Sequence, residues 1–165
     1  MSVATKTDHI LATVISYLDD DAALQCVKVW NAKTFTPSTS AFAKVFVWPL
    51  VDQYGAIAFE QGTDSDLQTM QVGIYCGFFK GAIDTTNAGT LTTSYNAYSE
   101  RIEKRIHVMN AALRSNPITD TTTVGAYTVG ITGATMTNRT GLVDNGDRTE
   151  AGFVVTLRVT YVQYY

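Results

Sequence analysis

The stretch Glu150–Tyr165, EAGFVVTLRVTYVQYY, is the clearest indication of the structure of this chain. Its residues alternate with the period of two that is typical of a β-strand. One face is uniformly apolar and comprises Phe153, Val155, Leu157, Val159 and Tyr161. The other face is only half polar and comprises Val154, Thr156, Arg158, Thr160 and Val162. We therefore predict a long strand whose first face meets the core and whose second face is also partly covered.

The composition indicates one globular domain, residues 1–165, with an unusually neutral surface. Hydrophobic residues make up 45% of the chain and charged residues only 16%, whereas about a quarter is usual for charged residues. The net charge of −3 argues against a basic nucleic-acid-binding surface. The N-terminal residues contain too short an apolar run for a membrane span and lack a cleavage-site pattern. We expect a soluble, unexported protein that packs against other subunits.

Two helices are predicted from apolar residues that recur every three or four positions. The first covers Ile10–Leu18, with Thr7 or Asp8 as its N-cap. It should stop near Leu18, because the carboxylates of Asp19–Asp21 oppose the helix dipole. The second covers residues 94–117, after a polar linker. Its sheet-facing residues are Tyr95, Tyr98, Ile102, Ile106, Met109 and Leu113.

Four further strands are predicted at 26–32, 41–50, 67–79 and within 119–140. The apolar face of the third comprises Met70, Val72, Ile74, Cys76 and Phe78. Gly73 and Gly77 on its other face indicate a bulge or the close approach of a helix. The long connection Val51–Asp66 is expected to hold a helical turn and then a reverse turn. The element order predicts an α+β fold, an antiparallel or mixed sheet of about five strands with two helices packed on one face.

The sequence predicts no catalytic residue, no cofactor site and no metal site, and hence no enzyme. None of the common catalytic or nucleotide-binding motifs occurs. His9 and His107 each lie alone in a predicted helix. The adjacent carboxylates of Asp19–Asp21 cannot surround an ion by themselves. Cys26 and Cys76 lie within predicted strands, where buried free thiols are the expected state.

The organisation of the chain resembles that of the tail terminator and neck proteins of tailed bacteriophages. The resemblance covers the opening helix with TDHILATVISYL, a three-strand middle, the long amphipathic helix and the closing FVVTLRVTYVQYY. It implies an α+β subunit that forms a homo-hexameric ring at the head-proximal end of the tail. Such a ring stops polymerisation of the tail tube protein and joins the tail to the head–tail connector. DNA passes its lumen without specific binding, and the protein belongs to the virion, assembled in the host cytoplasm.

Two alternatives remain open. One is another tail or head-completion component, such as a tail tube protein or a head–tail connector. The other is a small, non-catalytic ligand-binding α+β domain. The mass of the assembly separates them, because a ring closes, a tube polymerises and a binding domain stays small.

The last residues of the chain are predicted to reach a subunit boundary. We expect the closing strand to pair within its own sheet through about Tyr161, leaving Val162, Tyr164 and Tyr165 for a neighbour. Tyrosine is favoured at interfaces because it combines a large rigid area with a polar tip. A ring subunit also benefits from strand edges, since strand addition supplies main-chain hydrogen bonds across the boundary.

Overall fold

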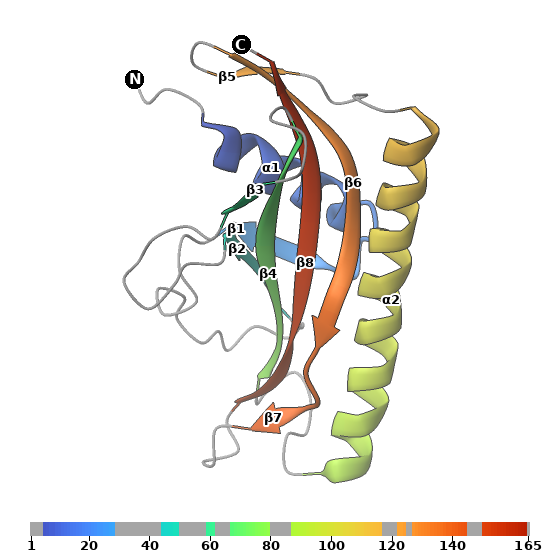
Figure 1. Cartoon of the computed structure of the whole chain (residues 1–165). Coiled ribbons are helices and arrows are strands. Elements are labelled where there is room, and N and C mark those ends of the chain that lie inside the picture. Colours follow the sequence, from blue (N-terminus) through green and yellow to red (C-terminus); the bar gives the residue numbers. More distant parts are fainter. Residues whose placement is uncertain are drawn as a thin grey trace.

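A computed structural model describes residues 5–28, 44–49, 59–61, 67–79, 87–116, 122–124, 127–144 and 150–164 (Figure 1). Within these ranges the chain forms two helices and eight strands. In order they are α1 (Lys6–Asp19), β1 (Gln25–Lys28), β2 (Lys44–Pro49), β3 (Phe59–Gln61), β4 (Leu67–Phe79), α2 (Ala88–Ser115), β5 (Thr122–Val124), β6 (Tyr127–Arg139), β7 (Val143–Asp144) and β8 (Glu150–Tyr164).

The strands form a single sheet in the order β1-β2-β4-β8-β6-β5, with β3 paired to β4 and β7 paired to β8. The strands β2, β4, β8 and β6 run antiparallel to their neighbours in this series, whereas β1 runs parallel to β2. The predicted α+β fold is therefore confirmed. The five predicted strands are present as β1, β2, β4, β6 and β8, and three short strands are added.

The connection Val51–Asp66 contains one of these short strands. Phe59, predicted to end a helical turn, instead begins β3, whose residues Phe59–Gln61 pair with Met70, Thr69 and Gln68 of β4. The prediction is wrong here because three residues carry too little periodicity to reveal a strand. The other residues of this connection, 51–58 and 62–66, lie outside the described part of the chain.

The closing strand β8 is one of the two central strands of the sheet, beside β4. It pairs with β4 from Glu150 to Val162 and with β6 as far as Tyr164, which lies opposite Thr128. Pairing within the subunit was predicted to end near Tyr161 and in fact continues to Tyr164. Because β4 and β6 pair with its two edges, β8 has few backbone groups left to pair with a strand of another subunit.

Both helices begin earlier than the sequence predicted. The N-cap of α1 is Thr5, whose Oγ1 accepts a hydrogen bond from the Asp8 amide at 3.2 Å, while the Asp8 carboxylate accepts one from the Thr5 amide at 3.1 Å. Asp8 is thus the second member of a capping box and not the cap itself. The N-cap of α2 is Asn87, so residues 88–93 are helical and not part of a linker. Threonine is a poor helix former, which concealed this first turn.

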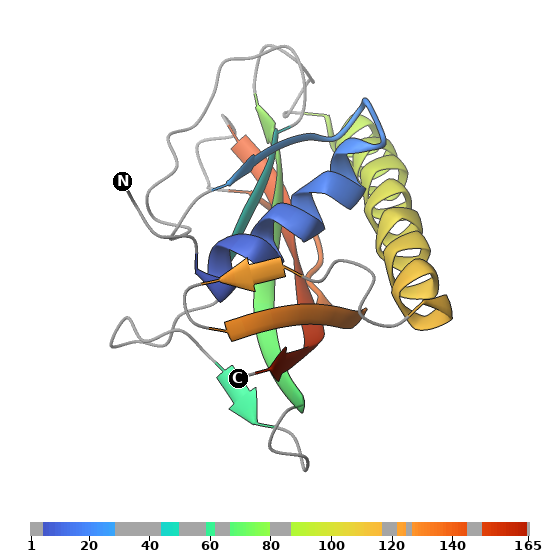
Figure 2. The same ribbon diagram turned by 90° about the horizontal axis from the view of Figure 1, so that it is seen from above.

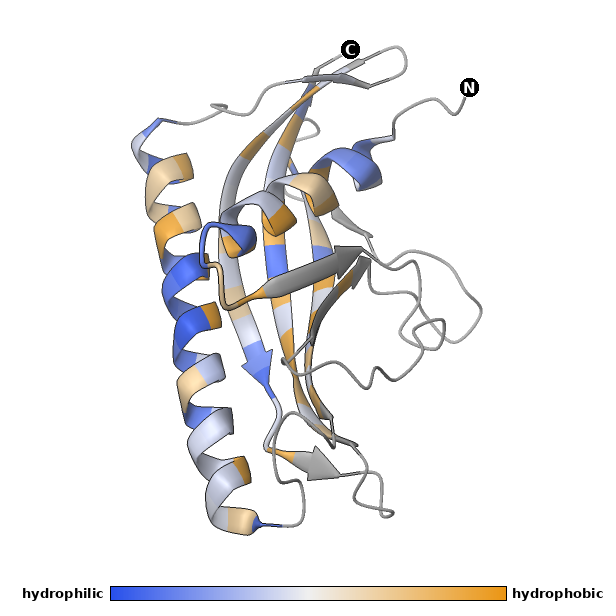
Figure 3. Ribbon diagram, turned by 180° about the vertical axis from the view of Figure 1, so that it is seen from behind, coloured by the Kyte–Doolittle hydropathy of each residue, from blue (hydrophilic) through white to orange (hydrophobic). Residues whose placement is uncertain are grey.

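The two helices lie on one face of the sheet, as predicted. The sheet curls into a half-barrel, with α1 lying across its hollow and α2 running along β6 (Figures 1 and 2). The predicted apolar faces meet there in one buried core. Figure 3 shows this side of the sheet, with α1 lying in front of the strands. The largest fully buried side chains are Tyr161, Phe78, Phe153, Ile10, Leu11, Leu18, Leu24, Met70, Ile74, Ile102 and Met109.

The register between β4 and β8 is continuous, so the bulge predicted from Gly73 and Gly77 is absent from this pair. Neither helix approaches these glycines, because both helices lie on the opposite face. The close approach involves another glycine. A Cβ atom at Gly152 would lie 2.5 Å from the hydroxyl of Tyr75 and 2.6 Å from the carbonyl oxygen of Cys76. The absence of a side chain at Gly152 therefore makes room for the side chain of Tyr75.

Candidate interaction surfaces

The face of the sheet turned away from the helices, here called the outer face, is the broadest candidate for an interaction. On β8 it carries Val154, Thr156, Arg158, Thr160 and Val162, and on β4 it carries Thr69, Gln71, Gly73, Tyr75 and Gly77. Arg158 is exposed and carries the only charge in this set, while the β8 residues around it are half-buried. Neither α1 nor α2 packs on this face. The sequence predicted that the second face of the closing strand is partly covered, and this remains a prediction.

Two of the residues predicted to form a subunit boundary, Val162 and Tyr164, lie at one end of β8, where α1 also begins (Figure 1). Val162 is half-buried on the outer face, opposite Leu67. The backbone of Tyr164 pairs with that of Thr128. The side chain of Tyr164 and the whole of Tyr165 lie outside the described residues. Their role at a boundary remains a prediction.

The side chain between them, Gln163, belongs to the core side of the sheet and is 4% exposed. Its Oε1 accepts a hydrogen bond from Lys6 Nζ at 3.3 Å, and Gln68 Oε1 accepts one from the same ammonium at 3.4 Å. The hydroxyl of Tyr161 donates to Gln68 Oε1 at 2.7 Å. Burial lowers the pKa of Lys6. This polar cluster joins the start of α1 to the end of β8, a contact that no local pattern in the sequence predicted.

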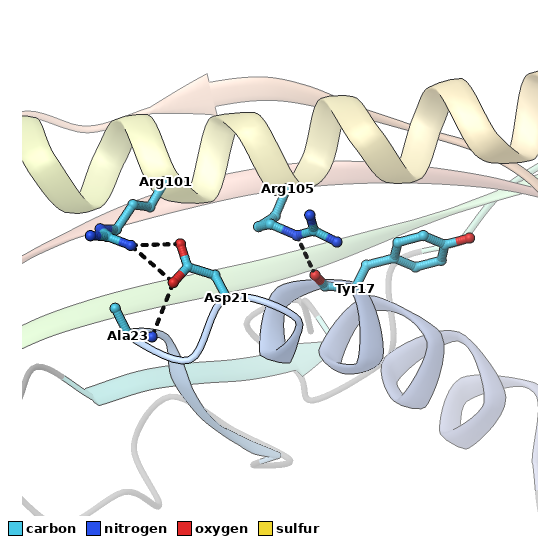
Figure 4. Close-up of polar contacts among 5 residues, drawn as sticks. All are labelled: Tyr17, Asp21, Ala23, Arg101 and Arg105. Atoms are coloured by element: carbon cyan, nitrogen blue, oxygen red, sulfur yellow. Dashed lines mark hydrogen bonds and ion pairs between the residues drawn. The ribbon is translucent and has the colours of Figure 1, made fainter.

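A second polar arrangement, the interhelix clamp, joins the end of α1 to the middle of α2 (Figure 4). Arg101 donates to both carboxylate oxygens of Asp21 at 2.9 Å. Arg105 donates to the carbonyl oxygen of Tyr17 at 2.7 Å and to the carboxylate of Asp20 at 3.0 Å. Asp21 also accepts from the Ala23 amide at 3.0 Å, which closes the turn after the helix. Asp20 and Asp21 are therefore ion-paired, and not merely the solvated helix stop that the sequence indicated.

Replacing Asp21 by asparagine should lower the free energy of unfolding by less than about 1 kcal/mol at neutral pH, because Arg101 is 49% exposed and water screens the pair. Burial raises the pKa of Asp21, but hydrogen bonds from Ala23 and Arg101 outweigh it and bring the pKa below 3.8. A carboxyl whose pKa is lowered by folding contributes stability above its ordinary pKa and loses that contribution as the pH falls through the folded value.

Urea denaturation of the wild type and of Asp21→Asn from neutral to acidic pH tests this. The difference between the two proteins should persist above pH 3.8 and shrink below it. Glu100→Gln on the exposed side of α2 is the matched control and should show a smaller difference. A gap between wild type and Asp21→Asn that is unchanged at low pH would show that the Asp21 charge plays no part.

The residues considered for chemistry lie apart from one another. Cys76 is buried on the inner face of β4, and burial raises the pKa of its thiol; the side chain of Cys26 lies outside the described residues. His9 is in α1, whereas His107 is exposed on α2. Within the described ranges, no group of three or more His, Cys, Asp or Glu side chains could hold a metal ion. No helix in the same ranges is long and apolar enough to cross a membrane.

Comparisons with known proteins add little to this geometry. No family model matches the chain, and no curated protein matches it. Among solved structures, 22 chains match. One of them aligns over 98% of this chain and 99% of its own length, with 14% sequence identity and a TM-score of 0.45, and its name states no function. A likeness of this degree carries no conclusion about function.

Proposed function

We propose that this chain is a structural virion protein, the tail terminator of a tailed bacteriophage, whose subunits form a hexameric ring at the head-proximal end of the tail. In this role it stops polymerisation of the tail tube protein and presents a docking surface to the head–tail connector. It acts by binding other subunits and not by catalysis.

The observation that carries the proposal is the outer face of the sheet. On β4 and β8 the outer face consists of Thr, Gly, Val, Gln and Tyr with Arg158 as the one charged residue of this set, and such a surface loses less hydration than a charged one when another subunit covers it. The low proportion of charged residues in the whole chain, 16%, points the same way. The organisation of the chain resembles that of tail terminator proteins, and this resemblance is the reason for proposing a tail terminator ring as the assembly.

The position of β8 changes how such a ring would be held together. A strand paired on both sides contributes through its face and its end, not through a free edge. We therefore propose that the outer face and the Val162–Tyr165 end of β8 contact neighbouring subunits. Contacts of this head-to-tail kind close into a ring when the rotation between successive subunits permits it.

Light scattering on the purified protein tests the assembly. We expect a closed oligomer of about six subunits of 18.0 kDa, either alone or once tail tube protein is added. A mass that grows without limit would instead identify a tube protein. A strict monomer at high micromolar concentration, with and without tail tube protein, would refute the proposed ring.

Two variants locate the contact. Arg158→Glu on the outer face should weaken the oligomer, while Lys104→Glu, which makes the same charge change on the exposed side of α2, should not. Removal of Tyr164 and Tyr165 should weaken assembly and leave the subunit folded, since the buried Gln163 is retained. Full assembly of the shortened chain would show that these tyrosines are ordinary surface residues.

A further inference from the structure

Within the described residues, the last part of β8 has a sheet neighbour on one side only. The pairing of β8 with β4 ends at Val162, which lies opposite Leu67, whereas the pairing with β6 continues to Tyr164. A strand end with one neighbour opens more readily than the centre of a sheet, because fewer backbone hydrogen bonds have to break. Further support for this end therefore comes from side chains.

Gln163 provides this support on the inner face of the sheet. Its side chain is 4% exposed and alternates with the fully buried Tyr161. Gln163 Oε1 accepts a hydrogen bond from Lys6 Nζ at 3.3 Å, and Lys6 is the first residue of α1. Removing the donor from a buried acceptor costs more free energy than the hydrogen bond itself contributes. The inward position of Gln163 therefore depends on Lys6.

The ammonium group of Lys6 is itself held by the sheet. It also donates to Gln68 Oε1 of β4 at 3.4 Å, and it lies 5.7 Å from the centre of the Tyr161 ring. The Tyr161 hydroxyl donates to the same Gln68 oxygen at 2.7 Å. A cation within about 6 Å of an aromatic ring is attracted by its face. The elements α1, β4 and β8 thus meet at one cation, which supports β8 beyond the point where its pairing with β4 ends.

Lysine is unfavourable at this position of a helix. The positive end of the helix dipole lies at the N-terminus, so a cation in the first turn weakens the helix, whereas a carboxylate such as that of Asp8 strengthens it. Lys6 is also half-buried, and burial is costly for an ammonium group. Both effects oppose Lys6, whereas its contacts with Gln68 and Gln163 favour it. The polar cluster therefore accounts for the lysine better than α1 does.

We propose that Lys6 is a positioning residue, a latch through which the docking of α1 on the sheet keeps the last residues of β8 in place. When α1 is docked, Lys6 holds Gln163 inward, and the alternation of the strand keeps Val162 on the outer face. When the start of α1 separates from the sheet, the end of β8 loses this support. The inference does not rest on the proposed ring, because it concerns how one subunit holds its own last residues. In any assembly that uses this end of β8, the subunit presents it only after α1 has docked.

Hydrogen exchange at the amides of residues 162–164, followed by NMR, tests the latch. Lys6→Met keeps a long side chain and a good helix former but removes the donor, and it should accelerate this exchange about three- to tenfold. Lys6→Arg keeps a donor and should stay near the wild-type rate. Lys104→Met makes the same change on the exposed side of α2 and is the matched control. The amide of Thr90, at the start of α2 and the opposite end of the molecule (Figure 1), should exchange at the wild-type rate in every variant.

A double variant isolates the contact between Lys6 and Gln163. In a Gln163→Leu background the acceptor is missing, so adding Lys6→Met should change exchange at residues 162–164 by less than about twofold. A full additional acceleration would contradict the proposal, because Lys6 would then act through another partner. If Gln163→Leu fails to fold, as judged by circular dichroism, the comparison of Lys6→Met with Lys6→Arg gives the result.

The coupling should also act in the reverse direction, because linkage between two sites is reciprocal. Gln163→Leu should accelerate exchange at the amide of His9, which bonds to the carbonyl oxygen of Thr5 in the first turn of α1 at 3.1 Å. An unchanged rate at His9 would show that β8 does not act on α1 and would refute the latch. Unchanged exchange at residues 162–164 in Lys6→Met would refute it too. Equal acceleration at Thr90 would point to a general loss of stability and would overturn it in the same way.

Discussion

Ile102→Ala is expected to lower the free energy of unfolding by about 2–5 kcal/mol. Ile102 lies in the middle of α2, on the side facing the sheet, and is 0% exposed. Its replacement removes buried methyl and methylene groups and leaves a cavity that neighbouring helices and strands fill only in part. Alanine favours the helix slightly more than isoleucine does, so the loss arises from packing and not from helix propensity.

Urea denaturation followed by circular dichroism measures the change. Val108→Ala on the same helix is the matched control, because Val108 is 36% exposed and fills no core space. Its effect should stay within about 0.5 kcal/mol. If Ile102→Ala were as stable as the wild type, α2 would not pack on the sheet through this face, and the helix would be available to a partner instead.

Gly152→Ala is expected to destabilise the protein by about 1–3 kcal/mol. An added Cβ would lie 2.6 Å from the carbonyl oxygen of Cys76 and from Cζ of Tyr75. The tyrosine ring could rotate away, but the Cys76 carbonyl belongs to the backbone of β4, so the two central strands must separate locally. The added methyl therefore weakens the pairing of β4 with β8 at this end of the sheet.

Gly141→Ala is the control for this change, because a Cβ at Gly141 would meet no atom within 4 Å. Thermal unfolding of the two variants side by side should show a lowered midpoint for Gly152→Ala and little change for Gly141→Ala. The double variant Gly152→Ala, Tyr75→Ala should recover only part of the loss, since the contact with the Cys76 carbonyl remains. Complete recovery would assign the whole effect to the tyrosine ring.

The features that the sequence predicted well are those that depend on neighbouring residues. The alternation from Phe153 to Tyr161 and from Met70 to Phe78 identified the inner faces of β8 and β4, and every one of these side chains is buried there. The spacing of Ile102, Ile106, Met109 and Leu113 identified the buried face of α2 in the same way. Errors occurred at element ends, as at Thr5 and Asn87, where one capping side chain decides the boundary.

The candidate surfaces were only partly predictable. The half-polar second face of the closing strand was evident from its composition, and it is the outer face of the sheet. The interhelix clamp could not be predicted from the sequence, because Asp21 and Arg101 are 80 positions apart in the chain. Gln163 lies between the predicted boundary residues Val162 and Tyr164, yet it is buried against Lys6, which is 157 positions away. Local patterns contain no information about such partners.

By itself, the sequence determined the class of fold, because apolar periods of two and of three to four residues arise from local backbone geometry and burial. It also determined that the surface is neutral and poor in charge. Three features became evident from the three-dimensional arrangement alone. The last strand lies at the centre of the sheet, Gly152 leaves space for the Tyr75 side chain, and Asn110 accepts a hydrogen bond from the amide of Ala134. These outcomes depend on which distant segments become neighbours, and that choice is made by packing of the whole chain and not by any single stretch of it.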